Sequence, residues 1–550
     1  MASSLLALLI FFRPLYSALV YPVSNQHYLL VLSILPLLFL SRKSKTWQLS
    51  SLSREEWTWI GFTAWTAIAF LWSVNKHSTL MQWELSLSYF YMYFLVKRTS
   101  PSFRRIIIWT IILPSIWVSI YAVYQYFWGL EETRRMVEMI GVKQFSSDFI
   151  TRLYTNRAFS TFVYPNALAG YLVILIPFTS VFFFKIKKPL RYFYLIIPSL
   201  QVIALILSKS KGGILSLILS LAILFWWLLN RKWKLCSTIV IILVLLIAIS
   251  FPLLRKSAEN SFGVRVSYWK AAARMIKARP ITGFGPGSFD RVFPRFKEAG
   301  REDTKMAHNN YLQVFSEGGI IYFLFFISFF YFALKNLHLG KDKTLIMGIQ
   351  TAVIAFLIHS LVDFDFYVPG ITLLLFAIIS LGMEQSTPGK NASPKPYLYS
   401  FLLLIPLVFI ITLKIIWSDI YYKETLYEMN KGNLKKAEYS LRKSIQIYPW
   451  GEDISRINYH FRLGELYLRE GKNAEDLNKA IIELRHATRL DPYRFFYWER
   501  LSLLYALKNN YKKALQYIDR ALFCYPSHPR LKKEKEEILN KLRSGDKGRQ

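Results

Sequence analysis

The sequence predicts an all-α polytopic membrane protein with about 12–13 transmembrane helices, followed by a soluble α-solenoid. Three observations predict this fold class. Hydrophobic residues make up 53% of the 550 residues and gather in long runs. Basic residues are abundant in every second loop between those runs, and the C-terminal part repeats at an interval of 34 residues. Long apolar runs fit a bilayer, whereas a charged, repetitive tail fits water.

Thirteen apolar runs are candidates for membrane-spanning helices. A run of about 18 or more apolar residues is long enough to cross the bilayer core. The first run lacks the basic start of a cleavable signal peptide, and another apolar run follows it at once. The thirteen runs cover residues 4–21, 27–41, 57–74, 79–96, 106–128, 166–184, 192–208, 213–229, 236–254, 319–336, 344–362, 367–383 and 398–416.

The net charge of +34 is distributed as in a membrane protein rather than a nucleic-acid-binding protein. If the N-terminus lies inside, the inner loops hold basic clusters within 42–54, 97–105, 185–191 and 231–234. The short outer loops then hold only Lys76, Lys209 and Lys211. This asymmetry is the positive-inside pattern. It predicts a membrane as partner, no nucleic acid, and a C-terminal domain on the outer side.

The C-terminal part consists of related helix pairs. Their spacing resembles the tetratricopeptide repeat, a helix–turn–helix unit of 34 residues. Such repeats often bind proteins, so a protein partner is open. We expect a membrane domain at 1–417, a repeat domain at 418–540 and a disordered tail at 541–550. The repeating positions are Ala480, Ala487 and Pro492, then Ala514, Ala521 and Pro526, with Ala437 and Pro449 in an earlier degenerate copy.

A polar element re-enters the membrane at residues 306–322, after a long outer loop at about 255–318. His308 and Asn309 are followed by nine residues, then Gly319, two more residues and Tyr322. A titratable imidazole at the mouth of an apolar helix is costly unless it has a function. A single His at such a place is more often a helix cap, and the spacing to Gly319 and Tyr322 argues against that reading.

The outer loop before this element carries a second group of candidates. Arg265 and Trp269 begin a predicted helix that ends before Pro280. Three alternating glycines follow at 283–287, in a turn whose amides we expect to face an anion. Arg265 offers a planar fork of hydrogen-bond donors suited to phosphate. The alternative without a catalytic role is that its side chain extends to the lipid headgroups.

Basic and amide side chains gather at other outer helix ends. Lys209 and Lys211 lie on the side where basic residues are rare, so they suit a bound anion there, although a simple charged loop is the alternative. Arg157 and Asn166 come to the same surface. A further set of ionisable residues either pairs for structural reasons or shapes an acceptor site: His359, Asp363 and Asp365.

Several kinds of chemistry have no motif in this chain. There is no cysteine–histidine pattern with zinc spacing, no Walker loop and no serine nucleophile elbow. We therefore expect no metal and no cofactor. Basic residues with one histidine on the outer face, away from ATP, suggest an activated anionic donor already across the membrane.

Together these residues resemble the O-antigen ligase and polymerase superfamily of bacterial inner-membrane glycan transferases. The ligase motif is His-[Asn/Ser/Gln], nine residues, Gly, two residues, [Gly/Thr/Tyr]. His308, Asn309, Gly319 and Tyr322 fit it at every fixed position, and Arg265 lies in a matching outer loop. The resemblance covers roughly residues 30–384.

The resemblance implies metal-independent transfer of a glycan from undecaprenyl diphosphate to an acceptor hydroxyl on the periplasmic face, with inversion. His308 would be the general base, and Arg265 would bind the diphosphate. Lys211 stands where the family has an arginine. The expected site is catalytic His308, Arg265 and Lys211, with Lys209, Arg157, Asn166, Asn309, Trp269 and Tyr322 binding substrate.

The acceptor remains open at this stage. Ligation to a lipid A-core is the leading interpretation, polymerisation of repeat units is the second, and transfer to protein hydroxyls is the third. Outside this class, the chain could be a transporter of lipid-linked glycans, which would place ionisable residues along a path at the membrane midplane. A scaffolding protein that recruits partners through its repeats is a further alternative.

Overall fold

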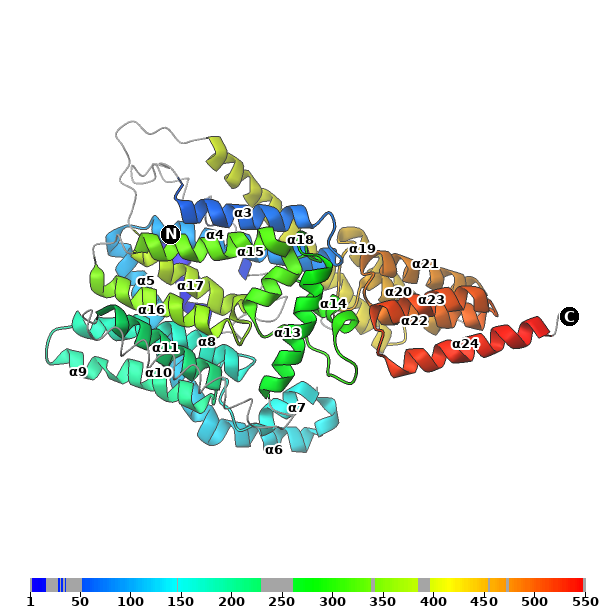
Figure 1. The fold of residues 1–550 in the computed structure, drawn as a ribbon, viewed down its shortest axis with the longest axis horizontal. Coiled ribbons are helices and arrows are strands. Elements are labelled where there is room, and N and C mark those ends of the chain that lie inside the picture. Colours follow the sequence, from blue (N-terminus) through cyan, green and yellow to red (C-terminus); the bar gives the residue numbers. More distant parts are fainter. Residues whose placement is uncertain are drawn as a thin grey trace.

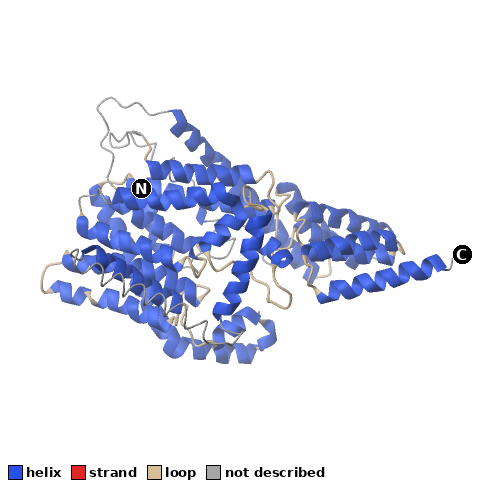
Figure 2. Cartoon of the chain, in the orientation of Figure 1, coloured by secondary structure: helices blue, strands red, loops and turns tan. Residues whose placement is uncertain are grey.

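The computed structural model describes residues 2–15, 28–29, 31–32, 35, 52–145, 147–228, 261–337, 342–383, 396–453, 456–470 and 474–547. Every regular element of more than one residue in this part of the chain is a helix (Figure 2). The all-α prediction is confirmed for these residues. Figure 1 shows a large helical body joined to a smaller C-terminal group of helices.

The helical body contains the apolar helices expected of a multi-pass membrane protein. Among the described residues, four stretches are long and apolar enough to cross a membrane: Pro101–Ile140, Pro165–Phe184, Leu190–Leu207 and Asn310–Leu337. Shorter apolar helices cover Ser3–Phe12, Lys211–Trp226, Lys343–His359 and Pro369–Gly382. The predicted span at 236–254 and most of that at 27–41 lie outside the described residues. The number of spans therefore stays a prediction.

The helices of the body keep close to the predicted runs. Most begin or end within a few residues of them, because charged, glycine or proline residues bound each apolar run. The helices are α1 (Ala2–Phe12), α3 (Arg54–Ala69), α4 (Lys76–Lys97), α5 (Pro101–Tyr124), α8 (Pro165–Ser180), α9 (Leu190–Tyr194), α10 (Ile196–Leu207), α11 (Lys211–Leu228), α15 (Asn310–Leu337), α16 (Lys343–His359) and α17 (Pro369–Gly382).

An aromatic core joins α3, α15 and α17. The Trp59 ring lies 4.5 Å from Phe62, 4.8 Å from Phe329 and 4.6 Å from Phe376, between ring centroids. Close van der Waals packing of this kind holds helices together where no water is available to drive association. Tyr322 belongs to the same core, because its ring stacks on Phe62 at 4.0 Å and it is 1% exposed.

Two stretches of chain between the apolar helices, which the sequence predicts to be outer loops, form helical segments. Residues 130–154 form α6 (Leu130–Ile140) and α7 (Ser147–Tyr154), which α5 reaches through a π-helical turn at Gln125–Gly129. Residues 261–309, called the outer segment below, contain α13 (Ser261–Ala278) and α14 (Phe289–Phe296). The helix predicted to begin near Arg265 is therefore present, and Pro280 follows its end.

The C-terminal unit, defined here as residues 418–547, is built of consecutive helix pairs. α18 packs on α19, α20 on α21 and α22 on α23, and each pair also contacts the next. Ala437, Ala480, Ala487, Ala514 and Ala521 are all fully buried in these contacts. The helices are α18 (Pro396–Asn430), α19 (Leu434–Ile447), α20 (Tyr459–Glu470), α21 (Ala474–Leu490), α22 (Phe495–Leu507), α23 (Tyr511–Cys524) and α24 (Pro529–Lys547).

Two predicted boundaries differ from the structure. The boundary between residues 417 and 418 falls inside α18, a continuous helix of 35 residues, so the last apolar helix and the first repeat helix are one element. Nothing in the sequence there breaks a helix. Residues 541–547, predicted to be disordered, continue α24, where Lys541 lies over the Tyr511 ring. Residues 548–550 of that predicted tail lie outside the described residues.

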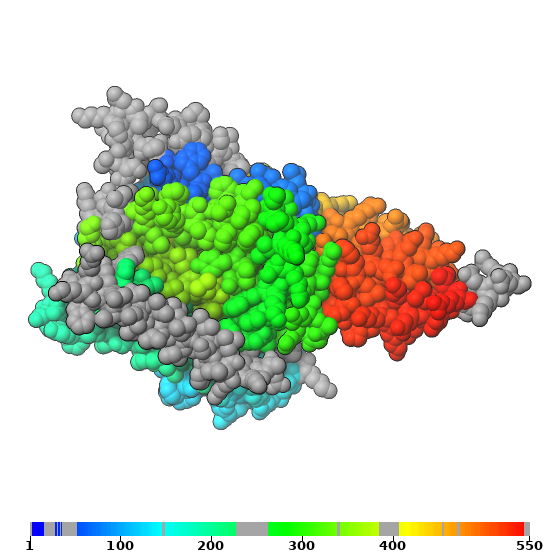
Figure 3. Space-filling model, in the orientation of Figure 1, coloured from blue at the N-terminus to red at the C-terminus, as the bar shows by residue number. Residues whose placement is uncertain are grey.

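A buried charge network, called the interface cluster below, joins the outer segment to the C-terminal unit. Arg291 of α14 is fully buried and lies 2.5 Å from Glu452 and 3.2 Å from Asp491. Its members are Asp290 and Arg291 of α14, Asn75 of the α3–α4 turn, and Glu452, Arg456, Asp491 and Arg494 of the C-terminal unit. Figure 3 shows the two surfaces in contact on this face.

The cluster contains a carboxyl group that titrates near neutrality. Burial raises the pKa of Asp491 from 3.8 to about 7, although Arg291 opposes this shift. The negative charges of Glu452 and Asp290 also raise it, and Asn75 and Arg494 face the same carboxyl group. Because the docked state holds the Asp491 proton more tightly than the undocked state, docking is strongest when Asp491 is protonated.

We predict that docking of the C-terminal unit weakens relative to its Asp491→Asn variant as the pH rises from 5 to 7. Over this range the undocked Asp491 carboxyl group is ionised and the docked one is protonated, so this group weakens docking by up to about tenfold per pH unit. His77, whose pKa burial lowers to about 3, acts with the opposite sign, and Glu452, whose pKa burial raises, acts with the same sign, but both are also present in the variant. Limited proteolysis around residue 453 should therefore accelerate with pH more in the wild-type protein than in Asp491→Asn, which also controls for the protease's own pH response. An equal pH dependence in both proteins would contradict the prediction.

Candidate functional site

His308 lies in a strained turn between the outer segment and α15. Its φ of 49° is in the left-handed region, which non-glycine residues seldom adopt. Its carbonyl oxygen accepts a hydrogen bond from Trp269 Nε1 at 3.4 Å. The imidazole is half-buried between the Phe364 ring at 4.9 Å and the Tyr268 ring at 6.0 Å. Backbone strain of this kind is often found at functional sites.

The residues that follow His308 fix it to the outer end of α16. Asn309 donates to the Leu361 carbonyl oxygen at 2.9 Å and accepts from the Leu312 amide at 3.0 Å. The Asn310 amide and side chain both bind Ser360 at 2.8 Å. Asn309, expected to bind substrate, therefore caps α15 and ties it to the α16 end.

A buried carboxylate connects His308 to Arg265. Asp363, in the turn after α16, lies 3.6 Å from His308 Nδ1 and 3.7 Å from an Arg265 nitrogen. Burial by itself would raise the pKa of Asp363, but His308, Arg265 and His359 hold it well below its usual range. Asp363 is thus an anion that faces one imidazole nitrogen and one guanidinium, at distances longer than a hydrogen bond.

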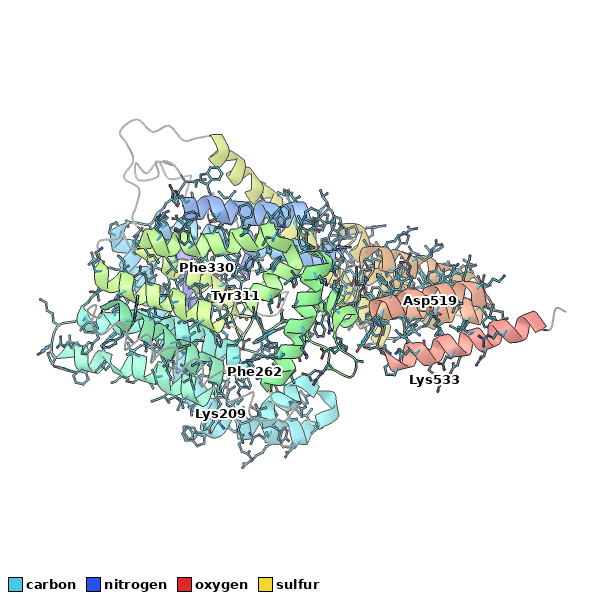
Figure 4. The ribbon with its side chains drawn as sticks, viewed as in Figure 1. Lys209, Phe262, Tyr311, Phe330, Asp519 and Lys533 are labelled. Carbon is cyan, nitrogen blue, oxygen red and sulfur yellow. The ribbon has the colours of Figure 1, made fainter. Side chains whose placement is uncertain are left out.

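The other predicted basic residues lie at the same end of the helical body. Arg157 donates to the Ser208 carbonyl oxygen at 2.9 Å and to Asn166 Oδ1 at 2.6 Å. Burial lowers its pKa, which the charge of Asp363 raises and the charge of Arg265 lowers. Lys209 is exposed, with its ammonium 5.2 Å from the Tyr126 ring centroid. Figure 4 shows Lys209 toward the start of α13, where Phe262 is labelled.

Lys211 is the first residue of α11 and is exposed. The next residue, Gly212, packs against the end of α16, because a Cβ there would lie 2.9 Å from Val362 and 3.6 Å from His359. The start of α11 is therefore next to the turn that carries Asp363. Lys211 is near the site, and no contact joins its side chain to His308 or Arg265 in the described structure.

A second buried pair supports the Asp363 turn. His359 Nδ1 and the Asp365 carboxylate are hydrogen-bonded, and both side chains are 1% exposed. α8 approaches this pair so closely that a Cβ at Gly170 would lie 2.2 Å from Asp365 Oδ1. Of the three ionisable residues noted in the sequence, His359 and Asp365 are thus structural, and Asp363 belongs to the site.

The alternating glycine turn does not present its amides to an external anion. The Gly285 amide donates to the Glu317 carbonyl oxygen at 2.8 Å, and the Gly287 amide donates to the Glu317 carboxylate at 2.8 Å. Phe289 and Tyr367 also donate to that carboxylate, at 3.1 and 2.7 Å. The group that this turn binds is the buried carboxyl group of Glu317, so the expectation of an external anion there is wrong.

Gly319 allows the outer segment to lie against α15. With φ at 74°, it kinks the helix, and a Cβ there would lie only 1.9 Å from the Ile281 carbonyl oxygen. The next amide, of Ile320, donates to the Pro280 carbonyl oxygen at 2.8 Å. Gly319 therefore has a backbone role in the motif, as Tyr322 has a core role.

The structure brings together His308, Arg265 and Arg157, with Trp269 on the backbone of His308. Asn166 is joined through Arg157, and the exposed Lys209 and Lys211 lie nearby. Tyr322 and Asn309 point into protein contacts instead.

Sequence reasoning missed the direct contact of Asp363 with His308 and the role of Glu317. A carboxylate directly before Gly318-Gly319, at the mouth of an apolar helix, was the signal for Glu317. Across the described residues, no three His, Cys, Asp or Glu side chains converge to hold a metal.

Two family models match the chain. The model described as O-Antigen ligase matches residues 193–327, which include Arg265 and His308. The model described as Virulence factor membrane-bound polymerase, C-terminal, matches residues 349–537, which include Asp363 and most of the C-terminal unit. No curated protein matches the chain. The two matches support the superfamily of O-antigen ligases and polymerases, whose members are membrane glycosyltransferase-like enzymes.

We predict that Gly319→Ala releases the outer segment from α15, because a methyl group there would collide with the Ile281 carbonyl and φ is unfavourable. Hydrogen exchange in residues 279–289 should rise. Gly300→Ala is the matched control, since Gly300 has the same φ of 74° with no atom within 4 Å of its Cβ position. Equal exchange in the two variants would mean that the close contact at Gly319 is unimportant.

Proposed function

We propose that this protein transfers a glycan from an undecaprenyl-diphosphate carrier to an acceptor hydroxyl at the outer face of the bacterial inner membrane. The observation that carries the proposal is the His308–Asp363–Arg265 arrangement. It combines a base, the anion that orients it and a phosphate-binding cation, at one end of a body of apolar helices. The two family matches support the same class of reaction.

His308 acts as the general base in this proposal. In this proposal the Nδ1 proton faces the Asp363 carboxylate, 3.6 Å away and without a direct hydrogen bond, and Nε2 accepts a proton. An acceptor hydroxyl at Nε2 gives up its proton as its oxygen attacks the anomeric carbon. Asp363 then stabilises the imidazolium that forms. Attack from the face opposite the diphosphate inverts the anomeric carbon.

Arg265 binds the diphosphate of the donor and stabilises the charge that develops as the sugar leaves. Its planar guanidinium can form paired hydrogen bonds to phosphate oxygens. Arg157, Lys209 and Lys211 add positive charge around the same place. Fixed cations near a leaving diphosphate fulfil the role of a divalent ion, so this reaction needs no metal. Lys211 provides the charge of the family's arginine without its fork.

The acceptor is a lipid A-core in the leading proposal. The O-antigen ligase model covers both Arg265 and His308, which favours ligation. The polymerase model covers Asp363 and the C-terminal unit, and this match favours chain polymerisation as the second candidate. The C-terminal unit, proposed to be a tetratricopeptide domain on the periplasmic side, keeps transfer to a protein as the third candidate. A protein partner would bind through it.

We predict that His308→Ala abolishes transfer while donor binding and protein level are retained, because only the base is lost. Mass spectrometry of products tests this. Purified protein receives an undecaprenyl-diphosphate oligosaccharide with a lipid-core acceptor, a candidate protein acceptor or no added acceptor. Glycan on the lipid or protein identifies the acceptor class, and longer chains on the carrier identify a polymerase.

His486→Ala provides the matched control, since His486 is an exposed histidine of the C-terminal unit far along the chain from the site. It should leave every product unchanged. Undiminished transfer by His308→Ala would remove the general-base role. Intact donor in every reaction of the wild-type protein, with donor and acceptors from the native host, would instead support a transporter or a scaffold.

We predict that Asp363→Asn lowers the transfer rate by about 100-fold or more, because an uncharged amide neither orients Nδ1–H nor stabilises the imidazolium. The side-chain shape is kept, so the donor KM should change less than kcat. Asp519→Asn, at an exposed carboxylate of α23, should have no effect on either constant. A rate within a factor of about two of the wild type would exclude an electrostatic role for Asp363.

A further inference from the structure

The outer segment behaves as one packed body that carries a site residue at one end. Tyr268 and Met275 of α13 pack with Phe289, Val292 and Phe293 of α14, and all are buried. The Tyr268 and Phe293 rings meet edge to face with centroids 5.6 Å apart. α13 also carries Arg265 and Trp269, which contact Asp363 and the His308 backbone. A shift of α14 therefore moves the groups that face the substrate.

α14 is attached to the membrane body at its first residue, where the Phe289 amide binds Glu317. Its other attachment is to the C-terminal unit. Arg291 donates to Glu452 at 2.5 Å and to the Arg456 carbonyl oxygen at 3.1 Å. Arg295 adds a contact over the Phe523 ring at 3.6 Å. A fully buried guanidinium is strongly destabilising without its carboxylates, so α14 and the C-terminal unit hold each other in one arrangement.

The α3–α4 turn closes the same contact from a third side. Asn75 donates to Glu452 at 2.6 Å, and the Val74 amide donates to the Phe284 carbonyl oxygen at 3.0 Å. Thr79 donates to the Pro286 carbonyl oxygen at 2.9 Å. Tyr493 of the C-terminal unit packs against Phe284 with centroids 5.9 Å apart. The glycine turn is thus enclosed between the membrane body and the C-terminal unit.

We propose that the transfer site needs the C-terminal unit for its activity, and that Arg291 is a positioning residue. Arg291 holds α13 in place, and α13 in turn keeps Arg265 in a fixed position relative to His308. The inference rests on the proposed function for its chemical consequence, whereas its structural consequence is independent of that function. A tail that only recruits a partner would not need its charges buried against the helix that supports the site.

The test uses the full-length protein with Arg291→Gln and, separately, Glu452→Gln. Each substitution leaves a buried charge without its partner and should loosen α14. Hydrogen exchange across residues 261–278 should rise while exchange in α3 and the second half of α15 stays unchanged. The transfer rate should fall by about 100-fold, since a displacement of about 1 Å in a site group has effects of that size. The double variant should be little worse than either single one.

Lys277→Gln is the matched control, because Lys277 is an exposed cation of α13 that makes no ion pair or hydrogen bond to α14 in the described structure. It should change neither exchange nor rate. Arg494→Gln is a milder variant at the rim of the interface cluster, where the arginine contacts Asp491 at 3.4 Å, and it decides the question if the other two variants do not accumulate.

Normal exchange in α13 together with a normal rate in Arg494→Gln and in any other variant that accumulates would overturn the proposal. So would raised exchange in α13 with an unchanged rate in a wild-type protein that transfers glycan. If the wild-type protein transfers nothing, the proposed function fails, and the exchange data alone still show whether Arg291 positions α13.

Discussion

The outer segment depends on the buried carboxylate of Glu317. It accepts hydrogen bonds from Gly287, Phe289, Tyr367 and Gln313, and its own carbonyl oxygen accepts one from Gly285. A buried carboxyl group of this kind is tolerated only when hydrogen-bond partners surround it. Those donors come from the glycine turn, from the start of α14 and from the segment before α17. One side chain at the membrane boundary therefore gathers three parts of the chain that are far apart in sequence.

In the sequence motif around His308, one residue has a proposed chemical role and the others have structural roles. His308 is the member that faces the proposed substrate, and Asn309 holds it by capping α15 and binding the α16 end. Gly319 admits the Ile281 carbonyl beside the helix, and Tyr322 anchors that helix to α3 through Phe62. The spacing between the motif residues is therefore fixed by one backbone turn, at His308, and the kinked helix α15 that follows it.

The sequence alone was sufficient for elements whose cause is local. Apolar runs located the helices of the body, and the 34-residue interval located the helix pairs with their buried alanines. The motif and the long outer loop predicted His308 and Arg265 as site residues, and the structure places both beside Asp363, while their roles stay a proposal. What could not be predicted depends on contacts between distant segments. The glycine turn looked like a site for an external anion because its true partner, Glu317, lies about 30 residues later on a different helix. The interface cluster joins residues more than 150 positions apart.

The geometry of the proposed site also explains why contacts from several helices hold its residues in place. Asp363 is reached from α16, His308 from α15 and Arg265 from α13, so no single helix fixes all three. The distances from Asp363 to His308 and to Arg265 are 3.6 and 3.7 Å, slightly longer than hydrogen bonds. A small movement of any of the three helices would therefore change these distances. Asp365 and His359 stabilise the turn after α16 that carries Asp363. Asn310 and Ser360 stabilise the start of α15, next to His308. α13 is held by α15 and by α14, and α14 is held in turn by the C-terminal unit, so the position of Arg265 depends in part on the most distant part of the chain. Electrostatic stabilisation of a leaving diphosphate is sensitive to such accuracy, because preorganised charges act most strongly where they need not move.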